Sequence, residues 1–217
     1  MLTERIFCLL IAGLGGAALL RASRILRGEY NKGMFVFYTG QSNLLMVLFH
    51  ALLFGASFAP QSALYAFLSA PWVRIIVVTC ITITFVVYHF ILTPGYKKNH
   101  PDRFRQEYFT FDNLTVHYAV PWLVILCWAI CAEKNAPLWS AAAWLALPLA
   151  YVAYALLRGR FGGTMNGRPD GPRYPYPFLD AEALGPKGLA KNLVLYLAAF
   201  YLVGLAYVGL AKVLSLL

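Results

Sequence analysis

The chain has 217 residues, of which 60% are hydrophobic and only 12% are charged, and its formal net charge is +9. A soluble domain of this length carries about a quarter of its residues as charged side chains, so the charges here are too few to coat a water-facing surface. The basic residues are divided among separate segments and form no basic helix or aromatic-basic module, which excludes a nucleic-acid-binding domain. Composition therefore indicates a protein that lies within a membrane.

Six apolar stretches are each long enough to cross a bilayer as a helix, which takes about 20 residues. The sequence therefore predicts an all-α fold, a polytopic membrane bundle of six transmembrane helices that forms a single domain over residues 1–217. The predicted helices cover about residues 5–26, 34–58, 72–93, 111–132, 138–157 and 189–213. The first stretch also has the length of a signal peptide, but no small-residue cleavage site follows it, so we expect a retained helix.

Basic residues gather in alternate loops. The first and third loops hold four each and the fifth loop, counted through Lys191, holds six, which together make 14 of the 18 Lys and Arg residues. Because cytoplasmic loops are rich in Lys and Arg, these three loops are predicted to be cytoplasmic, with both termini on the outer side. The fifth loop, residues 158–188, contains the aromatic run 174–179, and a disordered linker would have fewer aromatic residues. We expect this loop to fold against the inner helix ends and to help cover a site there.

Polar side chains at membrane depth are costly and therefore mark candidate functional residues. At 1.5 Å per residue, Thr39 lies about 8 Å below the inner surface, His117 about 9 Å and His89 about 6 Å. Three helices thus bring a hydroxyl and two imidazoles to one level, while His50 lies roughly 16 Å beyond Thr39. Asn113 is four residues before His117, so it shares a helix face with it and is expected to hydrogen-bond the ring.

A structural interpretation competes with the functional one, because Ser, Thr, Asn and His side chains also join helices by hydrogen bonds inside membranes. For any one of these residues that role is the ordinary one. The four cysteines stand in apolar runs without a CxxC pair, so we interpret them as small buried hydrophobic residues. No metal site and no cofactor is predicted.

Three segments resemble the androgen-induced membrane protein family and its bacterial six-helix relatives. They are Phe37-Tyr-Thr-Gly-Gln-Ser-Asn-Leu-Leu45, Asn113-Leu-Thr-Val-His-Tyr-Ala-Val-Pro121, and Tyr176-Pro-Phe-Leu-Asp180 followed by Gly185-Pro186. The segments occur in the order expected of the family, from the second helix to the last loop. Ser42 stands where animal members have an acidic residue, and the spacing from histidine to proline is one residue shorter, so the likeness is to the bacterial branch.

This resemblance implies a function, because the characterised animal members are threonine hydrolases that cleave fatty acid esters of hydroxy fatty acids. It places Thr39 at the nucleophile position and His117 at the catalytic histidine. Residues expected to orient these groups or to line the substrate are Asn113, Gln41, Asn43, His89 and Tyr176. The implied partners are membrane lipids and a lipid ester that enters from the bilayer, with no nucleic acid, and the implied location is the bacterial inner membrane.

Two other functions fit parts of the pattern. His89 and His117 come from different helices at one depth and are able to ligate a haem, as in a membrane electron carrier. A small transporter is a further alternative, although transporters often show repeated halves around a midplane site, and this chain has no internal repeat. A membrane scaffold without any site is the remaining interpretation.

Overall fold

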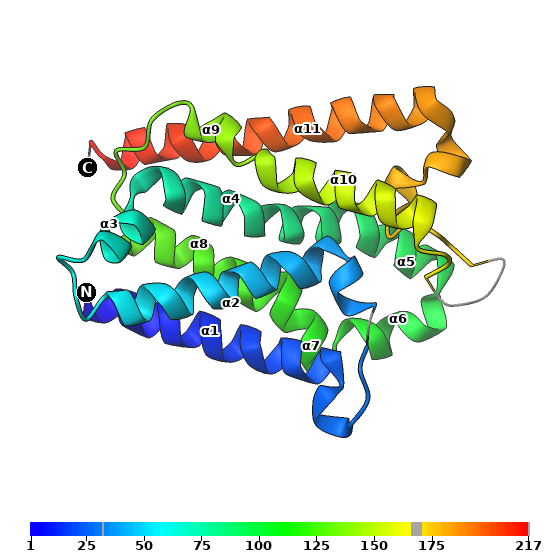
Figure 1. Cartoon of the computed structure of the whole chain (residues 1–217), viewed down its shortest axis with the longest axis horizontal. Coiled ribbons are helices and arrows are strands. Elements are labelled where there is room, and N and C mark those ends of the chain that lie inside the picture. Colours follow the sequence, from blue (N-terminus) through cyan, green and yellow to red (C-terminus); the bar gives the residue numbers. More distant parts are fainter. Residues whose placement is uncertain (32, 166–170, 217) are drawn as a thin grey trace.

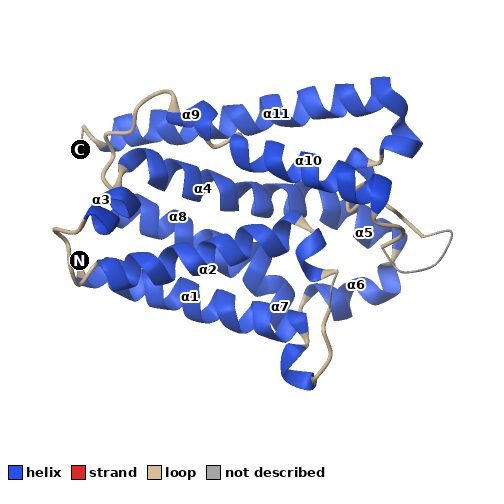
Figure 2. Ribbon diagram, in the orientation of Figure 1, coloured by secondary structure: helices blue, strands red, loops and turns tan. Residues whose placement is uncertain are grey.

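The computed structural model describes residues 1–31, 33–165 and 171–216, and within them the chain is helical and contains no strand (Figure 2). Six helical segments are long and apolar enough to cross a membrane, which confirms the predicted number of spans. They are Leu2–Ser23, Tyr38–Ala56, Pro71–Asn99, Phe111–Cys131, Ser140–Phe161 and Ala181–Leu214. The chain is therefore an integral, multi-pass membrane protein.

Several spans are built from more than one helical element. The first two are single helices, α1 (Leu2–Ser23) and α2 (Tyr38–Ala56), and the last is α11 (Ala181–Leu214). The other three spans are composite. The third consists of α4 (Pro71–Val86), η3 (Val87–Leu92) and α5 (Thr93–Asn99), and the fourth consists of α7 (Phe111–Leu114), η4 (Thr115–Ala119) and α8 (Val120–Cys131). The fifth consists of α9 (Ser140–Ala143) and α10 (Ala146–Phe161). Short helices α3 (Ala63–Ser69) and α6 (Pro101–Tyr108) and the turns η1 (Ile25–Arg27), η2 (Met34–Val36) and η5 (Pro177–Leu179) connect them.

Four of the predicted helices have wrong bounds. The first helix begins at Leu2 and ends at Ser23 rather than spanning 5–26, and the second begins at Tyr38, because residues 34–36 form a separate turn. The third does not end before Pro94, since the helix continues through η3 and α5 to Asn99. The sixth helix begins at Ala181, eight residues before the predicted start at residue 189. It is interrupted at Gly185, which has a φ of 65° and stands directly before Pro186.

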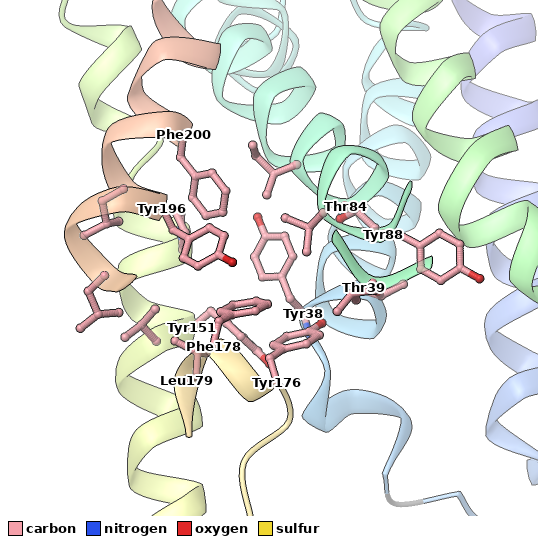
Figure 3. A pocket seen from close by; sticks show the side chains of 17 residues that line it. Tyr38, Thr39, Thr84, Tyr88, Tyr151, Tyr176, Phe178, Leu179, Tyr196 and Phe200 are labelled. Carbon is pink, nitrogen blue, oxygen red and sulfur yellow. The ribbon is translucent and has the colours of Figure 1, made fainter. Parts of the chain in front are cut away.

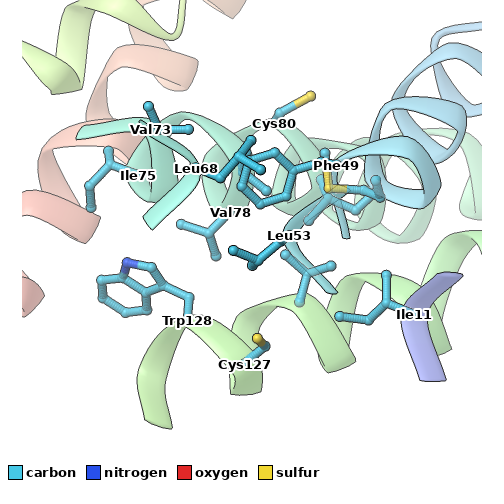
Figure 4. Packing of buried hydrophobic residues seen from close by; sticks show 14 of the residues in the cluster. Ile11, Phe49, Leu53, Leu68, Val73, Ile75, Val78, Cys80, Cys127 and Trp128 are labelled. Atoms are coloured by element: carbon cyan, nitrogen blue, oxygen red, sulfur yellow. The ribbon is translucent and has the colours of Figure 1, made fainter. Parts of the chain in front are cut away.

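Helices α1, α2, α4 and α8 enclose the main core (Figure 4). Ile11, Leu53, Val78 and Val124 come from these four helices and are buried almost completely. Helix α11 packs on α4 and α9, so the last span lies along one side of this group (Figure 1). The core therefore fixes α2 against α4 and α8, and these are the helices that carry the candidate residues.

The two ends of the bundle differ in character. Both termini lie at one end, and the longer connections after α1, α5 and α10 lie at the other (Figure 1). At the terminal end, Glu4 and Arg74 form a buried ion pair with a 3.0 Å separation, and the Tyr65 hydroxyl donates to the same carboxylate at 3.2 Å. A buried pair is tolerated only when both charges are satisfied, so this pair fixes α1 to α4.

Candidate functional site

Thr39 and His117 are adjacent in the folded chain. The Thr39 Oγ1 atom lies 3.3 Å from the His117 Nε2 atom, although 78 residues separate them. Thr39 is the second residue of α2, and His117 is in the middle of η4, a π-helical turn. Both side chains are half-buried. The two elements thus bring together a hydroxyl and an imidazole that the sequence placed at one depth.

Two contacts set the position and tautomer of the imidazole. His117 Nδ1 lies 3.0 Å from the backbone carbonyl oxygen of Asn113, and because a carbonyl only accepts, Nδ1 carries the proton. Nε2 of the neutral ring is then free to accept the Thr39 hydroxyl proton. The Tyr88 ring stacks on the imidazole with ring centres 3.5 Å apart and an angle of 14°. His117 is therefore oriented for the acceptor role.

The expected role of the Asn113 side chain is corrected by these contacts. Its Nδ2 atom donates to the Tyr88 hydroxyl at 2.7 Å and to the Tyr108 carbonyl at 2.9 Å, and it does not touch the imidazole. The backbone of Asn113 holds the ring directly, while its amide holds the tyrosine that stacks on the ring. The i to i+4 spacing identified the right pair of residues but not the atom that makes the bond.

Asn43 joins the two elements that carry the candidate pair. Its side chain is fully buried, and Nδ2 donates to the Thr39 carbonyl at 2.9 Å and to the Val116 carbonyl at 3.0 Å. Because both partners are carbonyls, the amide nitrogen must face them. One side chain therefore links the first turn of α2 to the residue before His117.

Gln41 does not contribute to the site as expected. Its Nε2 atom donates to the Phe35 carbonyl at 2.8 Å, so it holds the η2 turn against the start of α2. Gly40 permits the same approach, because a Cβ atom there would lie 2.3 Å from the Met34 carbonyl oxygen. These two residues fix the backbone next to Thr39.

Tyr176 reaches Thr39 from the loop between α10 and α11. It is buried, its hydroxyl accepts a hydrogen bond from the Tyr38 amide at 3.2 Å, and it lies beside the Thr39 side chain. Burial raises the pKa of this hydroxyl, opposed by its hydrogen bond with Thr39, so it keeps its proton at neutral pH.

The loop itself is fixed to the helix ends, as predicted. Tyr174 packs on Gly159 of α10, where a Cβ atom would lie 2.2 Å from the tyrosine ring. Arg173 donates to the carbonyls of Gly159 and Arg160 at 3.0 and 2.8 Å. Asp180 caps α11 by accepting from the amides of residues 182 and 183. Residues 171–180 therefore form a cover over this end of the bundle.

Two cavities meet at Thr39. A narrow one of about 50 Å³ extends between α4, α10 and α11 and has apolar walls (Figure 3). A wide one of about 1130 Å³ faces the loop end of the bundle and has many polar residues in its wall. Thr39, Tyr88 and Tyr176 contribute to both cavities, whereas His117 contributes only to the wide one. Thr39 thus lies where a narrow apolar cavity meets a wide cavity that also carries polar side chains.

His89 lies outside this arrangement, contrary to expectation. It is exposed on the outer surface of η3, where Nδ1 contacts the Tyr118 hydroxyl at 3.0 Å, and it lines neither cavity. His50 is buried in the core, with Nδ1 2.8 Å from the Met46 carbonyl. Among residues 1–31, 33–165 and 171–216, no three His, Cys, Asp or Glu side chains are grouped as a metal site.

The candidate site contains two π-helical turns that were not predicted from the sequence. η3 carries Tyr88 and η4 carries His117. A π turn inserts an extra residue into the helix and frequently occurs at functional sites. Each π turn is followed two residues later by a proline, Pro94 after η3 and Pro121 after η4. A proline removes a backbone donor from the helix and crowds the preceding turn, so these two prolines are the sequence signal for the π turns.

No family model, no curated protein and no solved structure matches this chain. The resemblance of the three segments to the androgen-induced membrane protein family therefore stays a prediction from those residues.

Proposed function

We propose that the chain is an intramembrane ester hydrolase with Thr39 as the nucleophile and His117 as the general base. The observation that carries this proposal is the 3.3 Å contact between Thr39 Oγ1 and His117 Nε2, with the opposite ring nitrogen donating to a carbonyl. A hydroxyl becomes a competent nucleophile when a positioned base takes its proton. The third group that orients the base is here the Asn113 carbonyl.

The reaction proceeds in two balanced halves. His117 Nε2 takes the proton from Thr39 Oγ1 as the oxygen attacks the ester carbonyl, and the protonated ring returns that proton to the alcohol oxygen as the ester C–O bond breaks. Water then attacks the acyl-threonine, again with His117 taking and returning a proton. The Tyr176 hydroxyl is the donor placed to stabilise the negative oxygen of each intermediate.

The location of the pair favours a lipid substrate. Thr39 and His117 belong to membrane-crossing helices and lie near one end of the bundle. An ester with a hydrocarbon tail reaches such a site from the bilayer without passing through water. The sequence resemblance narrows the proposed substrates to fatty acid esters of hydroxy fatty acids or similar lipids, and the proposed location to a bacterial inner membrane.

Substitution of the pair tests this proposal. In purified detergent-solubilised protein, Thr39→Ala and His117→Ala should each lower ester hydrolysis by about 10³-fold. The two losses should be similar, because removing one member of a catalytic unit costs about as much activity as removing the whole unit. Thr39→Ser keeps the hydroxyl and should retain part of the activity. Thr39→Ala should also abolish covalent labelling by a fluorophosphonate probe.

Thr79→Ala is the matched control. Thr79 is fully buried in α4, and its hydroxyl bonds only to its own helix, at the Ile75 carbonyl. This variant should keep both activity and labelling. Unchanged hydrolysis by Thr39→Ala would refute the nucleophile assignment.

A further inference from the structure

The two cavities at Thr39 divide the space available to a substrate into two unlike parts. An ester attacked by Thr39 must place its carbonyl carbon at the hydroxyl, so its acyl and alcohol portions extend in different directions from that point. The narrow cavity has apolar walls, whereas the wide cavity has a mainly apolar wall that also carries polar residues, His117 among them. The question is which portion occupies which cavity.

The position of His117 decides this assignment. His117 must protonate the departing alcohol oxygen, so the alcohol portion lies on the side of the imidazole. His117 lines only the wide cavity. We propose that the acyl chain of the substrate occupies the narrow cavity between α4, α10 and α11, that the alcohol portion occupies the wide cavity, and that Phe200 sets the acyl chain length. This inference rests on the proposed hydrolase function.

The walls of the narrow cavity suit a hydrocarbon chain. Hydroxyl groups do line it, but Tyr38 donates to the Cys80 carbonyl, Tyr151 donates to the Val36 carbonyl and Thr84 bonds to Ser42. These bonds turn three of the lining hydroxyls to protein partners, so most of the surface that faces the cavity is carbon. A chain without polar atoms loses no hydrogen bonds when it enters such a space.

Phe200 stands at the end of the cavity away from the 176–179 turn (Figure 3). The Phe200 ring packs on the fully buried Trp144, with ring centres 5.9 Å apart, and this contact holds the Phe200 ring in place. Along α11, the lining extends from Leu193 to Phe200, which is roughly 10 Å at 1.5 Å per residue. This length suits a medium acyl chain such as octanoyl better than palmitoyl.

The division also fits the order of the reaction. After the first half, the acyl chain is bound to Thr39 and remains in the narrow cavity, while the alcohol leaves through the wide one. Water then enters through the wide cavity on the side of His117, where it needs the base. Neither product has to pass the other.

A series of p-nitrophenyl esters tests the assignment. Wild-type protein should prefer the octanoate over both the butyrate and the palmitate in kcat/KM. Phe200→Ala opens the end of the cavity and should raise the palmitate-to-octanoate ratio roughly tenfold, in line with the effect of hydrophobic pocket size on specificity. Phe200→Leu keeps an apolar side chain and should shift the ratio in the same direction by less.

Tyr201→Ala is the control, because Tyr201 is the adjacent aromatic residue, is exposed and does not line the cavity. An equal shift in Tyr201→Ala, or an unchanged ratio in both Phe200 variants with activity retained, would overturn the assignment.

A binding experiment separates this inference from the hydrolase proposal. An octanoyl ester with a photoreactive diazirine at the end of its acyl chain should cross-link Thr39→Ala protein within residues 193–200, at positions other than Tyr196, which lines both cavities. It should not cross-link within residues 93–110, at the wide cavity. Cross-links at the wide cavity would reject the acyl assignment even if the hydrolase proposal holds. Absence of Thr39-dependent hydrolysis, with cross-links at residues 193–200, would reject the catalytic proposal and leave an acyl-binding cavity.

Discussion

At the scale of single residues, the contact between Thr39 and His117 depends on a side chain that touches neither reacting atom. The Asn43 amide spans the carbonyls of Thr39 and Val116, which belong to different helices. In a low-dielectric interior a backbone carbonyl that loses its donor keeps its full desolvation cost. Asn43 therefore controls both the stability of this junction and the separation of hydroxyl and imidazole.

Asn43→Leu should show this coupling. It preserves side-chain size but removes the donor that the Thr39 and Val116 carbonyls share. This loss should destabilise the protein by about 1–3 kcal/mol and lower ester hydrolysis together with the melting temperature. Gln41→Leu is the control, because Gln41 bonds only to the Phe35 carbonyl and lies away from the cavities. Equal losses of hydrolysis in the two variants would show that Asn43 has no special part in aligning the pair.

Single residues were also where prediction from sequence worked best. Placing the polar side chains of Thr39 and His117 at membrane depth costs free energy, so their positions in apolar helices indicated a function. Counting residues from the helix ends then gave nearly equal depths for the two. His89 satisfied the same arithmetic and is nevertheless exposed on the outer surface. Depth fixes the level of a residue but not the direction of its side chain, which depends on helix rotation within the bundle.

At the scale of elements, the segment 171–180 acts as a rigid cover. Tyr174 lies against α10, Tyr176 reaches α2, and Asp180 begins α11, so three helix ends are joined by ten residues. Its aromatic content made this cover predictable from sequence. The π turns η3 and η4 were not predicted, although a proline follows each of them two residues later.

Gly159→Ala should loosen this cover. The new Cβ would lie 2.2 Å from the Tyr174 ring and force it away from α10. We expect faster tryptic cleavage after Arg173 and a severalfold loss of hydrolysis, with the bundle still folded. Gly209→Ala on α11 is the control, since a Cβ there meets nothing within 4 Å and helix propensity favours Ala by up to about 1 kcal/mol. Unchanged cleavage after Arg173 would contradict the role assigned to Tyr174.

At the scale of the whole molecule, the distribution of basic residues gives the orientation that we propose. Both termini lie at one end of the bundle, and the candidate site lies toward the other (Figure 1). Three of the basic residues at the terminal end are engaged within the protein. Arg5 donates to Ser57, Arg74 pairs with Glu4, and Lys134 donates to the Trp128 carbonyl. The basic residues of the loops at the site end are more numerous, and cytoplasmic loops are enriched in Lys and Arg.

The resulting prediction is that both termini face outward and the site faces the cytoplasm. Alkaline phosphatase, which is active only outside the inner membrane, should be active when fused after Leu214 and inactive when fused in the connection between α5 and α6. Green fluorescent protein, which fluoresces only in the cytoplasm, should give the opposite pattern at the same two positions. Even a reversed result at both positions would leave six spans intact, but it would place the wide cavity on the outer face. Equal signals at the two positions would contradict the arrangement of the spans, since an odd number of crossings separates them.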